Sequence, residues 1–108
     1  MSKPLNIIIS GGGTGGHLFP ALAIGDELQI QNSNIFIHYI GSKFGIEKDV
    51  LPIKNVQHSL LPIRGLQRSF SFESIGKNML LPSRLISSLS KIRQLFNEIK
   101  PQLVIGTG

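Results

Sequence analysis

The chain has 108 residues, which limits it to one small domain, and its 41% hydrophobic and 16% charged residues favour a folded core over disorder. It contains no cysteine, and His17, His38 and His58 lie far apart in sequence, so neither a disulfide framework nor a local metal site is expected. The net charge of +5 favours anionic partners, and nucleic acid, lipid headgroups, phosphorylated substrates or a solvated face without a partner are all compatible with it.

The first half of the chain alternates between strand and helix patterns. Leu5 to Ile9 is a short apolar run that predicts a strand buried on both faces of a parallel sheet. A glycine loop follows, and a helix is expected from about Pro20, because proline is tolerated in the first turn of a helix. The next elements are a strand over residues 35–40, a short helix over 45–51 and a weaker strand over 56–60.

The second half begins with a long loop and ends with a helix and a strand. Residues 62–82 contain two prolines, two glycines and three serines, and loops of this length are often functional. Helical spacing of apolar residues then continues to Ile99, and Pro101 ends it. Residues 103–105 predict a further strand. The alternation indicates a Rossmann-like α/β fold with a parallel sheet and flanking helices. Because a glycine turn follows this last strand without a helix, we expect a longer protein.

The glycine loop is the clearest functional signal. Five of the six residues from Gly11 to Gly16 are glycines, between a predicted strand and a predicted helix. Unpaired backbone N–H groups and the helix dipole create an anion site at such a position. A tight turn with positive φ is the simpler interpretation, but it requires fewer glycines. The loop therefore predicts binding of a phosphate or a sugar.

Two common nucleotide motifs fit the loop poorly. Positions 11, 13 and 16 match the dinucleotide pattern G-x-G-x-x-G, but the second strand closes with Gly41 and Ser42, and Glu47 lies beyond the turn. The acid that would hold a ribose is therefore missing. A Walker loop needs Lys and then Ser or Thr, whereas this chain has His17 and Leu18. Neither NAD binding nor ATP hydrolysis is favoured.

His17 is the candidate catalytic residue. It directly follows the glycines at the expected start of a helix, where it could donate to a diphosphate or transfer a proton. A structural histidine bonded to the loop backbone is the alternative. For His38 and His58, which fall within predicted strands, a structural role is favoured.

The sequence from Gly12 to Ala23, GGTGGHLFPALA, resembles the N-terminal signature of the MurG family, the N-acetylglucosaminyltransferases of peptidoglycan synthesis. The resemblance extends through residues 39–47, 63–66 and 100–108 and so spans the chain. Ser42 stands where the family usually has threonine, and the second glycine loop is incomplete at Gly108.

The resemblance implies a GT-B enzyme of two Rossmann-like domains. Residues 1–108 would be an incomplete N-terminal, acceptor-side domain without the C-terminal donor-binding domain, and would be inactive alone. The residues expected to bind UDP-N-acetylglucosamine or the acceptor diphosphate are Gly13, Thr14, Gly15 and Gly16. His17 would lie beside the reacting groups, either as general base or orienting a phosphate.

The implied reaction transfers N-acetylglucosamine from UDP, with inversion, to a muramoyl-pentapeptide acceptor linked to undecaprenyl diphosphate. No cofactor or metal is expected, since the chain has no Asp-x-Asp pair, and no nucleic acid partner is implied. The protein would be peripheral, on the cytoplasmic face of the bacterial inner membrane. Its possible membrane contacts are Arg64, Arg68, Phe70, Phe72, Lys77, Leu80 and Leu81.

Two other classes of function remain open from the residues alone. One is a nucleotide- or dinucleotide-binding module of another enzyme, against which the missing acid argues. The other is a non-catalytic anion-binding or interaction domain, for which the positive charge is sufficient.

Overall fold

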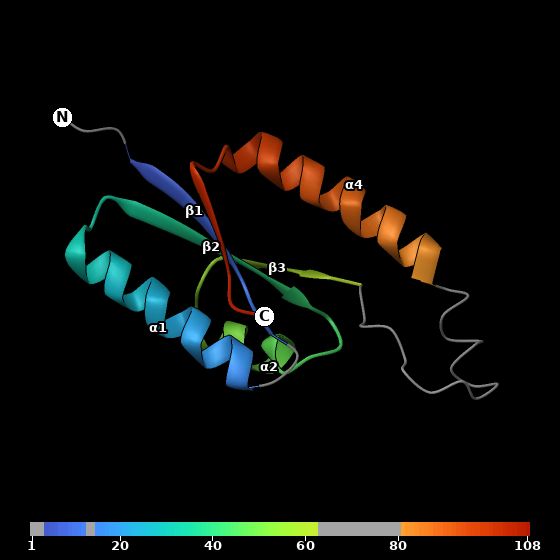
Figure 1. Ribbon diagram of the computed structural model, residues 1–108, viewed down its shortest axis with the longest axis horizontal. Coiled ribbons are helices and arrows are strands. Elements are labelled where there is room, and N and C mark those ends of the chain that lie inside the picture. The colour runs from blue at the N-terminus through green and yellow to red at the C-terminus, as the bar shows by residue number, and fades with distance from the viewer. Residues whose placement is uncertain (1–3, 13–14, 63–80) are drawn as a thin grey trace.

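The protein is a parallel sheet with helices on both faces, seen in a computed structural model (Figure 1). The structure describes residues 4–12, 15–62 and 81–108, and within 81–85 only the backbone. The elements in chain order are β1 (Leu5–Ser10), α1 (Gly15–Gln31), β2 (Ile35–Ser42), α2 (Glu47–Lys54), β3 (His58–Leu61), α4 (Leu81–Ile99) and β4 (Leu103–Gly106). The strands pair in the order β3-β2-β1-β4, all parallel, which confirms the predicted fold class.

Two apolar clusters hold the layers together. Because side chains alternate along a strand, Ile7 and Ile9 of β1 face α1 and α2, while Ile8 faces α4. The first cluster is completed from α1 by Leu18, Ala21 and Leu22, and the second from α4 by Leu95. Figure 1 shows α1 and α2 on one side of the sheet and α4 on the other.

The start of α1 differs from the prediction. The helix begins at Gly15, not near Pro20, and Pro20 lies inside it. The absent N–H of this proline removes only the helical hydrogen bond to the carbonyl of Gly16, so the preceding turn remains helical. The end of the glycine loop is therefore the first turn of the helix.

The other boundaries differ by three residues or fewer. The short helix was expected over residues 45–51 and covers Glu47–Lys54, because Pro52 is accommodated inside it and the left-handed Asn55, with φ 57°, ends it. The third strand begins at His58, two residues later than expected. The long predicted loop lies mostly outside the described residues, while α4 ends at Ile99 as predicted.

The order in which strands are added to the sheet reverses at β1. Strands β2 and β3 lie on one side of β1, and β4 returns to the other side. Ser10, the last residue of β1, is in register with Gly106, the last residue of β4. The loops after β1 and β4 therefore meet at the carboxyl edge of the sheet, at the topological switch point where open α/β sheets bind ligands.

Candidate functional site

The first glycine loop leads directly from β1 into α1. Gly15 and Gly16 are the first two residues of α1, whereas Gly13 and Thr14 lie outside the described residues. The N–H groups of the first helical turn have no partner within the helix, and those of Gly15 and Gly16 belong to residues without side chains. The first turn of α1 contains no acidic side chain. This edge can therefore accept an anion beside the backbone.

His17 occupies the third position of α1 and is exposed. Its Nδ1 lies 3.2 Å from the carbonyl oxygen of Gly12, which can only accept a hydrogen bond. The contact thus places a proton on Nδ1, and the neutral ring then carries its lone pair on Nε2. An imidazole in this form can accept a proton from a substrate hydroxyl at Nε2.

The loop after β4 packs against His17. The Thr107 hydroxyl donates a hydrogen bond to the His17 carbonyl oxygen at 2.7 Å, and the Thr107 N–H donates one to the Ser10 carbonyl oxygen at 2.9 Å. A Cβ atom on Gly11 would overlap the Thr107 hydroxyl, and one on Gly108 would meet the His17 ring. The two glycine loops thus approach each other closely because their glycines have no side chains.

Glu47 lies directly behind the first glycine loop. Only 1% of this glutamate is exposed, and its Oε1 accepts a hydrogen bond from the Ser42 N–H at 2.8 Å. Cβ atoms on Gly12, Gly41 or Gly45 would overlap the Glu47 side chain. The carboxylate thus fills a space bounded by three glycines, from the first glycine loop, the end of β2 and the turn after β2.

Glu47 follows the turn after the second strand, so the sequence does not indicate it as the acid of a ribose site. Because Glu47 is the first residue of α2, its carboxylate lies near the end of β2. The side chain is buried against the glycines, however, and does not face a ribose site. The position therefore does not favour dinucleotide binding. The sequence held one usable signal, a glutamate close to Gly41 and Gly45, but nothing in it related Glu47 to Gly12.

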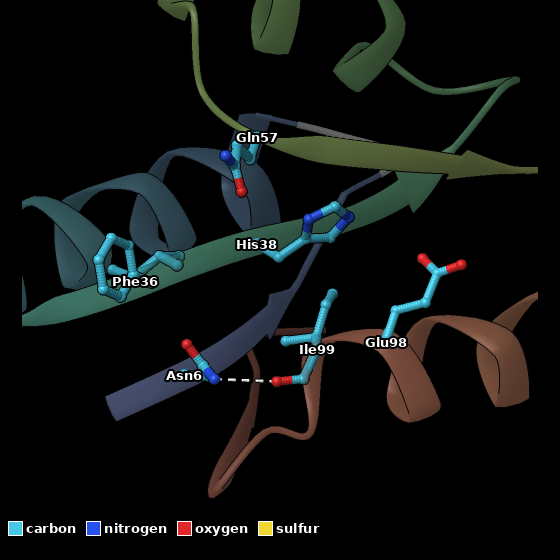
Figure 2. Close-up of a pocket in the computed structure, with 7 residues that line it drawn as sticks. Asn6, Phe36, His38, Gln57, Glu98 and Ile99 are labelled. Atoms are coloured by element: carbon cyan, nitrogen blue, oxygen red, sulfur yellow. Dashed lines mark hydrogen bonds between the residues drawn. The ribbon is translucent and has the colours of Figure 1, made fainter. Parts of the chain in front are cut away.

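A recess lies on the face of the sheet that α4 partly covers (Figure 2). It has a volume of about 180 Å³ and is lined by Asn6, Phe36, Ile37, His38, Gln57, Glu98 and Ile99. Figure 2 shows the His38 ring between the strands and the last turns of α4, with an Asn6 side-chain hydrogen bond to Ile99. Among the described residues, the lining contains none from either glycine loop.

The histidines outside the glycine loop have partners within the fold. The His38 Nε2 lies 2.8 Å from the Ser59 hydroxyl, and the His58 Nδ1 lies 2.8 Å from the Val56 carbonyl oxygen. Burial lowers the pKa of His38, with a smaller contribution from His58, and Glu98 opposes both. These contacts fit the structural roles expected for both histidines.

Of the proposed membrane-contacting residues, Arg64, Arg68, Phe70, Phe72, Lys77 and Leu80 lie outside the described residues, and of Leu81 only the backbone is described. Among the residues that are described, no three His, Asp or Glu side chains gather as metal ligands would. None of the described helices has the length and apolar character to cross a bilayer.

A parallel sheet with a glycine loop at its switch point defines an α/β domain of the class that binds nucleotides and other anionic ligands. Residues 7–108 match the glycosyltransferase family 28 N-terminal domain, and the chain belongs to this family. The resemblance found in the glycine loop and along the rest of the chain is thereby confirmed.

Two relatives that share one name come from different bacteria. A protein of Christiangramia forsetii is 43% identical over 108 residues, all of this chain and 28% of its own length. A Bacillus subtilis protein is 39% identical over 104 residues, 96% of this chain and 28% of its own length. Both are named UDP-N-acetylglucosamine--N-acetylmuramyl-(pentapeptide) pyrophosphoryl-undecaprenol N-acetylglucosamine transferase.

The fold also matches a solved structure. The crystal structure of Acinetobacter baumannii MurG aligns with a TM-score of 0.66 at 22% identity, covering 94% of this chain and 28% of that chain. The chain thus spans a little more than a quarter of the length of the relatives it matches.

Proposed function

We propose that the chain forms the acceptor-side part of an enzyme that transfers N-acetylglucosamine from UDP-N-acetylglucosamine to a lipid-linked muramoyl-pentapeptide. The names of relatives that match the whole chain at up to 43% identity support the substrates. The structural observation on which the proposal depends is the hydrogen bond from the His17 Nδ1 to the Gly12 carbonyl oxygen. It supports the proposal because it leaves the Nε2 lone pair of a neutral His17 free to accept a proton, beside a loop whose backbone N–H groups suit an anion.

Under this proposal, the acceptor hydroxyl attacks the anomeric carbon of N-acetylglucosamine with inversion, and UDP leaves. His17 accepts the hydroxyl proton at Nε2, while Nδ1 remains bonded to Gly12. The N–H groups of Gly15 and Gly16 at the start of α1, together with Gly13 and Thr14, stabilise a diphosphate. An imidazolium that only orients a phosphate is the alternative role for His17.

The domain organisation is part of the proposal. Residues 1–108 contribute an incomplete N-terminal domain, and a C-terminal domain binds most of the donor. The lengths of the relatives support this division, because the chain covers 28% of them. The isolated chain is therefore expected to be inactive.

We also propose that the enzyme works as a peripheral protein on the cytoplasmic face of the membrane. Helix α4 supports this by exposing a second apolar stripe beside its core-facing one: Ile86 is 69% and Leu89 58% exposed. Arg93 and Phe96 continue the stripe at helical spacing. Apolar groups with a nearby cation suit the headgroup boundary of an anionic bilayer.

Sedimentation with anionic vesicles tests the membrane contact in the complete natural protein. The triple replacement of Phe70, Phe72 and Lys77 by serine, and separately the pair Ile86→Ser and Leu89→Ser, should each reduce binding. Ile53→Ser is the control, since Ile53 is 86% exposed on α2. Equal binding by all variants would remove this part of the proposal.

Transfer of labelled N-acetylglucosamine to a lipid-linked acceptor tests the activity itself. We expect the complete protein to catalyse it, the isolated chain not to, and His17→Ala to lower kcat by about 10²–10⁴-fold. His58→Gln, which changes a half-buried histidine in β3, serves as the control. Full activity of His17→Ala would contradict the proposal.

The pH dependence of transfer separates the two roles of His17. A general base must be neutral, so under that role kcat should be higher in alkaline than in acidic buffer. An imidazolium that orients phosphate must be charged, so kcat should fall instead. The slope should be absent in His17→Gln if His17 causes it.

A further inference from the structure

The buried glutamate behind the glycine loop has no assigned role. Glu47 is the first residue of α2, where the helix dipole stabilises a carboxylate, and its Oε1 is bonded to the Ser42 N–H. A carboxylate that is 99% buried is costly unless its surroundings bind it, so its position is fixed by the fold. It is therefore a rigid group and not a mobile surface acid.

Glu47 is connected to His17 through one residue. The Glu47 side chain packs against Gly12 so closely that Gly12 has no room for a Cβ atom. The carbonyl oxygen of the same Gly12 lies 3.2 Å from the His17 Nδ1. Glu47 therefore packs against the residue whose carbonyl oxygen contacts the imidazole.

We propose that Glu47 is a positioning residue for His17. It supports Gly12 from behind, so that the Gly12 carbonyl holds the His17 proton on Nδ1 and leaves Nε2 to face the substrate. This inference rests on the proposed function, because it assigns Glu47 to the same reaction, but the state of the ring can be measured without any turnover. Glu47 itself does not contact substrate, since it is 1% exposed.

The proposed support of Gly12 depends on the length and shape of the Glu47 side chain. The space among Gly12, Gly41 and Gly45 fits a glutamate, and glutamine has nearly the same shape and retains an oxygen acceptor for the Ser42 N–H. Aspartate is one methylene shorter and would leave a gap behind Gly12. Alanine would remove both the acceptor and the support.

The test compares Glu47→Gln, Glu47→Asp and Glu47→Ala in the complete natural protein. Nitrogen-15 NMR of labelled histidine, with the His17 signals assigned by their loss in His17→Gln, reports which ring nitrogen bears the proton. Transfer kinetics give kcat and KM separately. Glu27→Ala is the matched control, because Glu27 is an exposed glutamate of α1.

We expect Glu47→Ala to convert the single Nδ1-protonated form of His17 into a mixture of tautomers. Its kcat should fall by about 10²-fold, as for a small misplacement of a reacting group, with a smaller change in KM. Glu47→Gln should retain the tautomer and most of kcat, which a general loss of stability would not explain. If Glu47→Ala fails to fold, Glu47→Asp should show the same change of tautomer.

Two results separate the proposals. Unchanged His17 signals in every folded Glu47 variant would overturn the positioning role, whatever the rate of transfer. Changed signals in a protein that transfers no sugar would retain the positioning role and contradict the proposed function.

Discussion

The two faces of the sheet are covered to different extents. Beneath α1 and α2, the apolar cluster runs along β1 and β2 from Ile7 and Ile35 to Tyr39. Beneath α4, the cluster is smaller, and Phe36 remains 57% exposed beside the open recess in Figure 2. Helix α1, which positions His17, thus packs on the well-covered face. The candidate site is therefore fixed by the more closely packed of the two layers, so substitutions in that layer should have the larger effects.

The largest effect on stability is expected from a substitution of Gly25, where α1 crosses β2. A Cβ atom on Gly25 would overlap the Tyr39 hydroxyl, so Gly25→Ala should lower the free energy of unfolding by about 1–3 kcal/mol through overpacking. Urea unfolding measures this. In the Tyr39→Phe background the same substitution should cost less, because the nearest atom, the Tyr39 hydroxyl, is gone. Equal costs in both backgrounds would contradict the proposed contact.

A smaller effect, an increase in stability, is expected for a substitution of Ser88, which lies on the side of α4 that faces the sheet. Ser88 is 1% exposed, and its hydroxyl has no hydrogen-bond partner among the residues that the structure describes. Ser88→Ala should therefore raise the free energy of unfolding by about 1 kcal/mol, since a buried unpaired hydroxyl is costly. Ser87→Ala, at an exposed neighbour, is the control for helix propensity. A loss of stability in Ser88→Ala would show that the hydroxyl is bonded.

The smallest effect concerns His38 in the open recess. Its pKa is lowered from 6.5, chiefly by burial, so the unfolded chain binds this proton more readily than the folded one. Stability should therefore decrease as pH falls through 6.5, until the lower pKa of the folded state is passed. Urea unfolding at about pH 8 and about pH 5 should show a smaller acid-induced loss in His38→Gln. The same loss in both proteins would exclude His38 as the cause.

Local patterns in the sequence predicted much of the fold. Parallel strands, the glycine loop and the end of α4 at Ile99 follow from nearest-neighbour chemistry and periodicity. The start of α1 was predicted too late, because Pro20 suggested a first turn, whereas packing of Leu18 on the sheet extends the helix back to Gly15. Tertiary contacts outweighed the local signal there.

The supports of the candidate site could not be predicted from local patterns. Glu47 reaches Gly12 only because β1 and β2 are paired, and Thr107 reaches His17 only because β4 pairs with the other edge of β1. Neither of these two contacts produces a periodic pattern in the sequence from which it could be predicted. The roles of Gly13 and Thr14 and the membrane contacts expected of residues 64–81 remain predictions, since Gly13, Thr14, residues 63–80 and the side chain of Leu81 lie outside what the structure describes.

The hydrogen bond between Thr107 and His17 joins residues 90 positions apart. A ribosome that adds about 5–20 residues per second makes its two partners roughly 5–18 s apart. A nascent chain can thus begin to form β1 and α1 before Thr107, which follows β4, is available to bond the His17 carbonyl oxygen. The first glycine loop is therefore synthesised well before Thr107, and the contact between them forms only after β4 has paired with β1.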